Sequence, residues 1–352
     1  MKTMETLPLL PSNKKQKKRY LFLSIILLIL IALVFFLRQI YLPLDSSSEK
    51  RIIFQIEKGQ EVDEIAARLK KEGIIRSPFV FKWSAFLFGV YGKLQAGVYY
   101  LSPAMSVNEI LKRISRGDIL KEKITIIEGW SIKDIGEYFE ERGICQADKF
   151  VSLAKEAGKE LAAEFSFLAS LPPTASLEGY LFPDTYEIKK DEDPKEIIKK
   201  MVKNFEGKVI LNKELAEKVK TQGWSLNEIV TMASLLEKEV RSYEDKQLVA
   251  GILWKRLKNN WPLQVDSTLT YLTGRLSREL TKEDLKIDSP YNTYKHLGLP
   301  PAPIANPGLE SIRAAVYYKN SDYWFYLTND KGETFFSKTL EEHNAKVKKY
   351  LR

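Results

Sequence analysis

The chain of 352 residues has one cysteine and two histidines, and this scarcity excludes several kinds of chemistry. Cys145 has no second cysteine for an intramolecular disulfide, and a zinc site built from several cysteines is excluded for the same reason. His296 and His343 supply few ligands for a hydrolytic metal centre and few bases for a Ser-His-Asp triad. We therefore expect no metal and no cofactor.

Beyond the first residues, the chain also has little net charge. The net charge is +9, but residues 1–19 contribute +5 of it and the rest of the chain only +4. Acidic and basic residues are interspersed there, which is typical of a solvated surface rather than of a stripe that binds nucleic acid. Hydrophobic residues make up 44% of the chain, enough for packed domains. We expect no nucleic-acid partner.

A long uncharged apolar run at residues 21–37 directly follows a basic cluster at 14–19. As a helix it would span roughly 26 Å, which approaches the thickness of a bilayer core. A cleaved signal peptide would have a shorter apolar stretch followed by small residues, so we favour an anchor. The basic cluster predicts a cytoplasmic N-terminus and an extracytoplasmic remainder in the cell membrane.

We divide this part of the chain into a cytoplasmic tail (1–19), a transmembrane anchor (20–42) and a linker (43–50). Fully extended, residues 38–50 would reach at most about 45 Å.

Two segments after the linker, 54–75 and 124–144, repeat one pattern. Gly59 aligns with Gly129 and Gly73 with Gly143, and each copy predicts a strand, a tight glycine turn, an amphipathic helix and a terminal glycine. This pattern resembles the LysM-like module, a small fold that binds cell-wall glycans. The resemblance leaves two roles open for residues 51–158, glycan binding or a structural stalk.

Residues 159–352 have an α+β pattern without an obvious parallel βαβ repeat. A hairpin is expected around Asn329–Gly332, between strands at 323–327 and 334–336, and Thr339 with Glu342 predicts a capping box at the last helix. Helices are expected at 194–206, 212–221, 225–240, 244–259 and 309–318. The whole chain is therefore expected to be α+β, with an N-terminal transmembrane helix and a LysM-like α/β stalk containing the internal repeat.

The most informative segment is Leu177-Glu-Gly-Tyr-Leu-Phe-Pro-Asp-Thr185. Glu178 is flanked by aliphatic and aromatic residues, and poor solvation would keep its carboxyl protonated and able to donate a proton near neutral pH. Gly179 would leave room for a substrate, and a turn at Asp184 would hold the loop. The alternative is that Glu178 only caps or pairs locally, because neighbours in sequence need not be neighbours in space.

This segment resembles the signature of the endolytic murein transglycosylase (YceG-like) family. The resemblance continues through residues 233–239, 249–257, 262–266, 289–294, 298–308 and 336–344, in the family's order. It implies that residues 159–352 are the catalytic domain and that Glu178 is the catalytic acid/base. It also implies that the enzyme cleaves the MurNAc-GlcNAc β-1,4 bond of nascent peptidoglycan strands to a 1,6-anhydro end and so terminates elongation, near penicillin-binding synthases.

A single carboxyl suffices for that reaction, because the C6 hydroxyl of the substrate replaces the attacking water. Glu237 and Glu239 lie two apart on one expected helix, so they face different sides. Asn306 either contacts the sugar or, as we favour, holds its loop. The candidate substrate-binding residues are Tyr180, Asp184, Glu237, Gln264, Asp266, Tyr291, Asn292, Tyr294 and Asn306.

Two other functions remain open on the sequence alone. A muramidase with a similar site would use water, and a non-enzymatic scaffold would bind peptidoglycan strands without cutting them.

Overall fold

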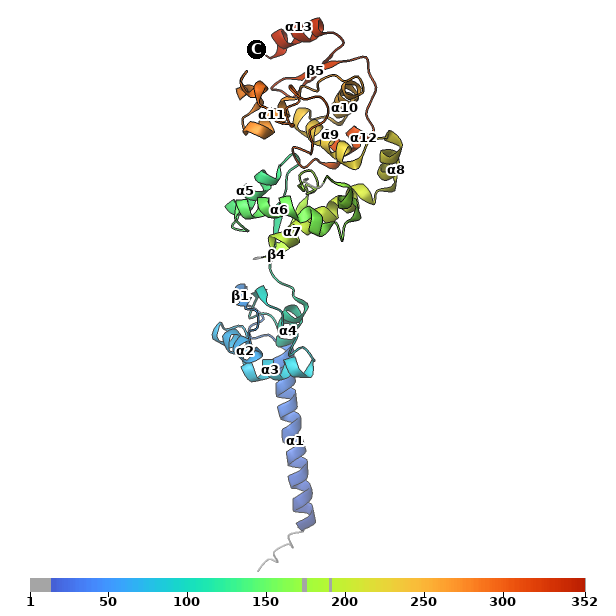
Figure 1. The fold of residues 1–352 in the computed structure, drawn as a ribbon. Helices are drawn as coiled ribbons and strands as arrows, with labels where there is room; N and C mark the ends of the chain where they lie inside the picture. Colours follow the sequence, from blue (N-terminus) through green and yellow to red (C-terminus); the bar gives the residue numbers. More distant parts are fainter. Residues whose placement is uncertain (1–13, 173–175, 190–191, 352) are drawn as a thin grey trace, which may run out of the picture. The chain divides into compact units, whose positions relative to one another are not determined.

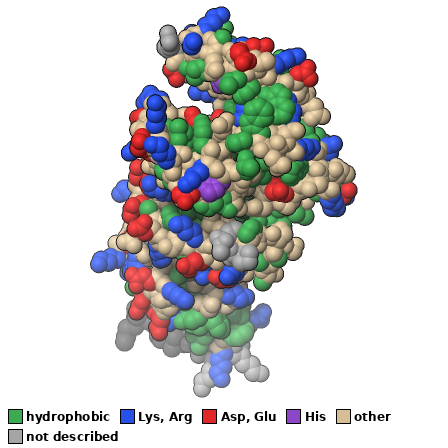
Figure 2. Space-filling model, turned by 45° about the horizontal axis from the view of Figure 1, so that its top comes forward, with side chains coloured by type: hydrophobic (Ala, Val, Ile, Leu, Met, Phe, Trp, Pro, Cys, Tyr) green, Lys and Arg blue, Asp and Glu red, His purple; other side chains and the backbone are tan. Residues whose placement is uncertain are grey.

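The structure is a computed structural model that describes residues 14–172, 176–189 and 192–351 (Figure 1). Most of the predicted cytoplasmic tail, residues 1–13, lies outside this part of the chain. The chain forms two compact units that divide between Lys121 and Glu122. Figure 2 shows acidic and basic side chains interspersed over the visible face, as the charge pattern predicts.

The first unit begins with helix α1 (Lys14–Tyr41), whose segment Lys18–Tyr41 is long and apolar enough to cross a membrane. Its apolar side chains are mostly exposed, which fits a single membrane anchor. Ile40, near its end, is buried where α1 contacts α3 (Pro78–Leu87) and α4 (Val107–Arg116).

A small antiparallel sheet completes this unit. Strand β1 (Ile52–Ile56) pairs with β2 (Gly97–Leu101), with Phe54 opposite Tyr99, and helix α2 (Val62–Lys71) lies between them in sequence. The apolar face of the sheet packs on buried residues of α2, α3 and α4.

The segment after α1 is not the extended tether considered from the sequence. The Arg76 guanidinium donates to the carbonyls of Leu42 at 3.3 Å and Leu44 at 2.8 Å, and the Asp45 N–H donates to the Pro103 carbonyl at 3.0 Å. These hydrogen bonds attach the end of the anchor to the first unit.

The second unit begins within β3 (Lys121–Thr125), which pairs with β4 (Thr185–Lys189). Between them lie α5 (Ile132–Glu141), α6 (Ala147–Leu161) and a 3₁₀ turn at Ser166–Ser170. The predicted domain boundary between residues 158 and 159 falls inside α6. The buried faces of α5 and α6 belong to the core of the second unit, so the structure places the division earlier, after Lys121.

The expected helices of the second unit are present within one or two residues at most ends: α7 (Pro194–Phe205), α8 (Lys213–Gln222), α9 (Leu226–Glu239), α10 (Tyr243–Lys258) and α12 (Leu309–Val316). Every residue of α9 from Ile229 to Leu236 is buried, and α10 and α12 pack against it. This central helix supports the loops that carry the candidate site.

The C-terminal part contains the predicted hairpin, β5 (Phe325–Thr328) and β6 (Thr334–Ser337), followed by α13 (Leu340–Tyr350). Thr339 caps α13 by accepting from the Glu342 N–H, whereas the Glu342 carboxylate accepts from the Lys338 N–H. Helix α11 (Asp266–Thr273), which was not predicted from the sequence, is short and follows an irregular segment at 261–265.

Candidate active site

Glu178 lies in the loop that leads into β4, and the neighbouring residues anchor this loop in the core. Leu177, Tyr180 and Leu181 are fully buried. Gly179 has a φ of +87°, and a Cβ there would lie 2.5 Å from a side-chain atom of Pro303. The space beside Gly179 is therefore filled by protein, which corrects the expectation that this glycine leaves room for substrate.

Glu178 is only 3% exposed, and its carboxyl is held by two kinds of donor. The backbone N–H of Ile132, the first residue of α5, lies 3.0 and 3.2 Å from its two oxygens. The Asn306 amide donates to Oε1 at 3.2 Å. The positive end of the α5 dipole therefore faces this carboxyl and favours its ionised form after a proton has left.

Asn306 joins three segments that are distant in sequence. Its Oδ1 accepts from the N–H groups of Gly179 at 2.9 Å and Leu181 at 3.0 Å. Its Nδ2 donates to the Trp130 carbonyl at 2.9 Å as well as to Glu178. This fully buried side chain therefore orients the Glu178 turn against the start of α5, which agrees with the structural role that the sequence favoured.

Burial raises the pKa of Glu178 to about 8. The Ile132 N–H, Lys155 and Lys238 act in the opposite direction, and the negative charge of Asp134 adds to the rise. Asp134 itself accepts from the N–H and hydroxyl of Ser131, which caps α5. Among the described residues, no second carboxyl forms a hydrogen bond with Glu178. With a pKa of about 8, the Glu178 carboxyl is mostly protonated at neutral pH and would act as an acid alone.

Two tyrosines are electrostatically coupled to this carboxyl. The charge of Glu178 contributes to raised pKa values of Tyr271 and Tyr291, for both of which burial is the larger cause. Their ring centroids are 5.3 Å apart, and Tyr271 is 38% exposed. Tyr291 was predicted from the sequence but Tyr271 was not, although it lies only five residues after the candidate Asp266.

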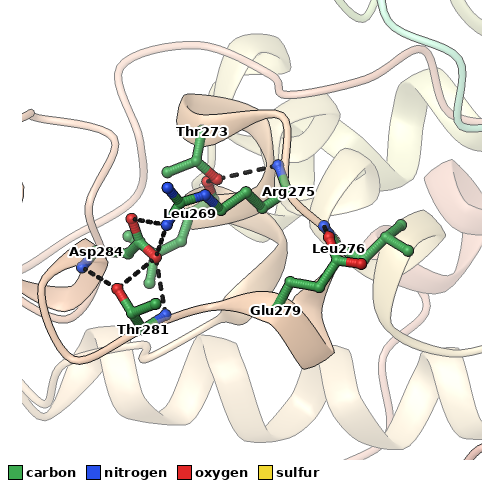
Figure 3. Close-up of polar contacts among 7 residues, drawn as sticks. All are labelled: Leu269, Thr273, Arg275, Leu276, Glu279, Thr281 and Asp284. Atoms are coloured by element: carbon green, nitrogen blue, oxygen red, sulfur yellow. Dashed lines mark hydrogen bonds and ion pairs between the residues drawn. The ribbon is translucent and has the colours of Figure 1, made fainter.

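The loop that follows α11 is fixed by a buried acidic side chain (Figure 3). Asp284 accepts from the Arg275 guanidinium at 2.9 and 3.1 Å and from the Thr281 N–H and hydroxyl, both at 2.8 Å. The Thr281 backbone N–H is the largest cause of the lowered pKa of Asp284. These bonds set the path of the chain between Tyr271 and Tyr291.

A second polar cluster forms around the start of α11. The Tyr294 hydroxyl and the Ser277 hydroxyl donate to the two carboxylate oxygens of Asp266. Gln264 is exposed, has a φ of +53°, and its N–H donates to the Thr293 carbonyl at 3.1 Å. Left-handed backbone at a residue other than glycine is strained and recurs at functional sites. The structure thus brings Gln264, Asp266 and Tyr294 into one region.

Glu239 extends this second cluster and was not among the candidate site residues. Its carboxylate accepts from the Ser267 N–H and the Tyr326 hydroxyl, both at 3.3 Å. Burial raises its pKa to about 6, and the charge of Asp266 adds to the rise.

Tyr180 and Asn292 have roles inside the core, so they are corrected as candidate sugar contacts. Tyr180 is fully buried, packs on Phe205 at 5.2 Å between ring centroids, and donates to Asn227. The buried Asn292 amide donates to the carbonyls of Leu285 and Ile287.

Glu237 and Asp184 are also engaged by the protein. Glu237 forms a buried ion pair with Lys246 at 2.9 Å and accepts from the Gly308 N–H and the Ser311 hydroxyl. Asp184 accepts from the Asn204 amide, the largest cause of its lowered pKa. Both acids hold loops in place.

Across the described residues, no group of three or more histidine, cysteine, aspartate or glutamate side chains could hold a metal ion.

Comparison with known proteins gives one consistent result. The model of the YceG-like family matches residues 54–349. A Bacillus subtilis protein named endolytic murein transglycosylase is 34% identical over 320 residues, covering 88% of this chain and 87% of that protein. A Streptococcus pneumoniae R6 protein of the same name is 30% identical over 338 residues, but this chain spans only 60% of that protein.

The fold is similar to a crystal structure of a yceG-like protein from Listeria monocytogenes. The TM-score is 0.58 with 32% sequence identity, and the match covers 85% of this chain and 99% of the other. Since the family model spans most of the sequence and the relatives match over most of this chain, the chain belongs to the YceG-like family.

Proposed function

We propose that this protein is a lytic transglycosylase that cuts within peptidoglycan strands at the MurNAc-GlcNAc β-1,4 bond and leaves a 1,6-anhydro-MurNAc end. The observation that carries the proposal is the buried carboxyl of Glu178, which the first N–H of α5 holds and whose pKa burial raises to about 8. The name endolytic murein transglycosylase, borne by the relatives, supports the same reaction class.

Glu178 acts first as the acid. It gives its proton to the glycosidic oxygen as the bond from that oxygen to C1 breaks, and the leaving sugar departs with a hydroxyl. The resulting carboxylate is stabilised by the Ile132 N–H and the Asn306 amide.

Glu178 then acts as the base. The carboxylate takes the proton of the C6 hydroxyl while this oxygen bonds to C1, which closes the anhydro ring and restores the acid without consuming water. The intramolecular hydroxyl supplies the proximity that a bound water would otherwise need.

A hydrolytic muramidase is the second candidate. Such enzymes use a second carboxylate as nucleophile or as the base for a water. Among the described residues, no second carboxylate forms a hydrogen bond with Glu178, and Asp134, whose negative charge acts on Glu178, is occupied in capping α5. This favours the transglycosylase.

Substrate access requires movement near Glu178, because a residue that is only 3% exposed cannot present its carboxyl to a glycosidic oxygen in the present conformation. Tyr271 and Tyr291 are the side chains best suited to open and then stack on a sugar ring. Gln264 and Asp266 would hydrogen-bond to sugar groups farther along the strand, with Tyr294 orienting Asp266.

The setting of the reaction is part of the proposal. Helix α1 would cross the cell membrane once, with the N-terminus in the cytoplasm and Glu178 outside, close to nascent strands and to penicillin-binding synthases. Residues 51–158, which contain both copies of the repeat, would serve as a LysM-like module, either binding glycan or acting as a stalk. Cleavage there would terminate strand elongation.

The test is mass spectrometry of muropeptides released from purified sacculi by the full chain. Wild type is expected to release products with anhydro ends, which are lighter than reducing ends by one water. Glu178→Gln is expected to release none, while the exposed Glu141→Gln, the matched control, retains activity. Products with reducing ends alone would support the muramidase, and strand binding without any new ends would support a scaffold.

A further inference from the structure

Helix α3 of the first unit is apolar on both of its faces. Val80, Phe81 and Ala85 are buried in the core of this unit. The opposite face exposes Phe79, Trp83, Phe86 and Leu87, by 63, 46, 64 and 60% of their surfaces. A helix that is apolar all round is typical of burial on both sides, in protein or in lipid.

The exposed side chains form one continuous strip, which we call the α3 aromatic face (Phe79, Trp83, Phe86 and Leu87). The ring centroids of Phe79 and Trp83 lie 5.9 Å apart, and those of Trp83 and Phe86 lie 6.0 Å apart. The single charged residue of the helix, Lys82, is paired with Asp63 at 2.7 Å. Contiguous exposed apolar patches of this kind mark interaction sites.

The position of α3 within the first unit identifies the partner. Helix α1 contacts α3 and α4, and Figure 1 shows α3 beside the point where α1 joins this unit. The apolar segment Lys18–Tyr41 has 24 residues, which span about 36 Å, whereas the hydrocarbon core of a bilayer is about 30 Å thick. The last turn of α1 would therefore emerge at the level of the lipid headgroups, together with α3.

Two further features fit that level. Arg76 binds the carbonyls of Leu42 and Leu44, so the chain leaving α1 holds this unit close to the helix end. A groove beside the end of α1 is lined by Tyr41 and Phe88 and by the exposed basic residues Lys112 and Arg116. Tryptophan and tyrosine rings favour the membrane interface, and basic side chains favour lipid phosphates.

We propose that the α3 aromatic face inserts into the interfacial layer of the bilayer that α1 crosses. The first unit is then attached to the membrane at two places, the transmembrane helix and α3, and cannot rotate freely on the anchor. This inference uses only the first unit and is independent of the chemistry at Glu178.

Spin labelling of the full chain in lipid nanodiscs tests the proposal. In a Cys145→Ser background, a nitroxide is placed at Phe86→Cys, with Leu30→Cys in α1 as the lipid reference and Ile53→Cys on β1 as the water reference. Ile53 is 58% exposed, which matches Phe86 closely. The measured quantity is the ratio of collision rates with oxygen, which enriches in lipid, and with a water-soluble nickel complex.

The ratio at position 86 is expected to approach that at position 30 and to exceed that at position 53 clearly. A ratio equal to that at position 53 would place α3 in water and overturn the proposal. Exclusion of both probes would also overturn it, because protein, either a second copy or the second unit, would then cover the face.

A second measurement keeps the native Cys145. The difference in tryptophan emission between wild type and Trp83→Phe is recorded in liposomes with ordinary and with brominated acyl chains. Bromine quenches nearby indoles, so the difference is expected to shrink strongly in brominated lipid. An unchanged difference would show that Trp83 does not reach the bilayer.

Discussion

Replacing Glu178 by glutamine is expected to make the protein more stable while abolishing cleavage. Glutamine keeps an oxygen that can accept from the Ile132 N–H, and it removes only the ability to ionise. The direction of this stability change follows from the raised pKa of Glu178. In the unfolded chain the carboxyl ionises near its ordinary value of 4.5, whereas in the folded protein it keeps its proton up to about pH 8. The folded state therefore binds more protons between these values, and stability falls as the pH rises.

The size of the stability change follows from the pKa of Glu178 in the unfolded chain and in the folded protein. Each pH unit above 4.5 costs the folded wild type about 1.4 kcal/mol, until the pH reaches the folded pKa. At pH 7 the accumulated cost is about 3 kcal/mol, and at pH 5 it is below about 1 kcal/mol. Glu178→Gln lacks this cost, so its advantage over wild type should grow by about 2–3 kcal/mol between pH 5 and pH 7.

Equilibrium unfolding in urea at pH 5, 6 and 7, followed by tryptophan fluorescence, measures this difference. Five of the six tryptophans belong to the second unit, so the signal reports mainly on the part that contains Glu178. Exposed Glu141→Gln is the control for loss of one carboxylate and is expected to change stability by less than about 0.5 kcal/mol. A stability difference for Glu178→Gln that stays constant with pH would refute the reasoning. In parallel, wild-type kcat/KM should fall above about pH 8, where the acid loses its proton.

Four further single variants and one double variant, measured by urea unfolding and sacculus digestion, test the packing around Glu178 and the neighbouring loops. Asn306→Ala leaves the buried N–H groups of the Glu178 turn without an acceptor. The free energy of unfolding should fall by about 1–3 kcal/mol, and most of the activity should be lost. Unchanged stability and activity would contradict the positioning role of Asn306. Gly223→Ala, at φ +76° in open space, should cost roughly 1–2 kcal/mol from strain alone. Gly179→Ala should lower the stability by at least about 1 kcal/mol more than Gly223→Ala does, because the added Cβ would also collide with the Pro303 side chain. Equal losses of stability in the two variants would argue against that collision. Lys246→Met leaves the buried Glu237 charge unpaired at a cost of roughly 3–5 kcal/mol, which adding Glu237→Gln should partly reverse.

Local patterns predicted most elements of the fold. The apolar run, the strand-glycine-helix segments and the helices that support the site all have periodic apolar residues and capping side chains, which act over a few neighbouring residues. The short α11 was missed because three of its eight residues are β-branched threonines, which have low helix propensity. The domain boundary was misplaced because the buried stripe on α5 and α6 does not reveal which core it joins.

The sequence by itself determined the long apolar helix and the family, and it singled out Glu178 as a carboxyl with apolar neighbours. The sequence could not separate residues that contact a sugar from residues that hold a loop. Tyr180 and Asn292 were therefore predicted as sugar contacts, although both are buried in the core. Only the tertiary structure decided this, because burial and hydrogen bonding depend on segments distant in the chain. The raised pKa of Glu178 arises where its loop, the start of α5 and Asn306 converge and exclude water.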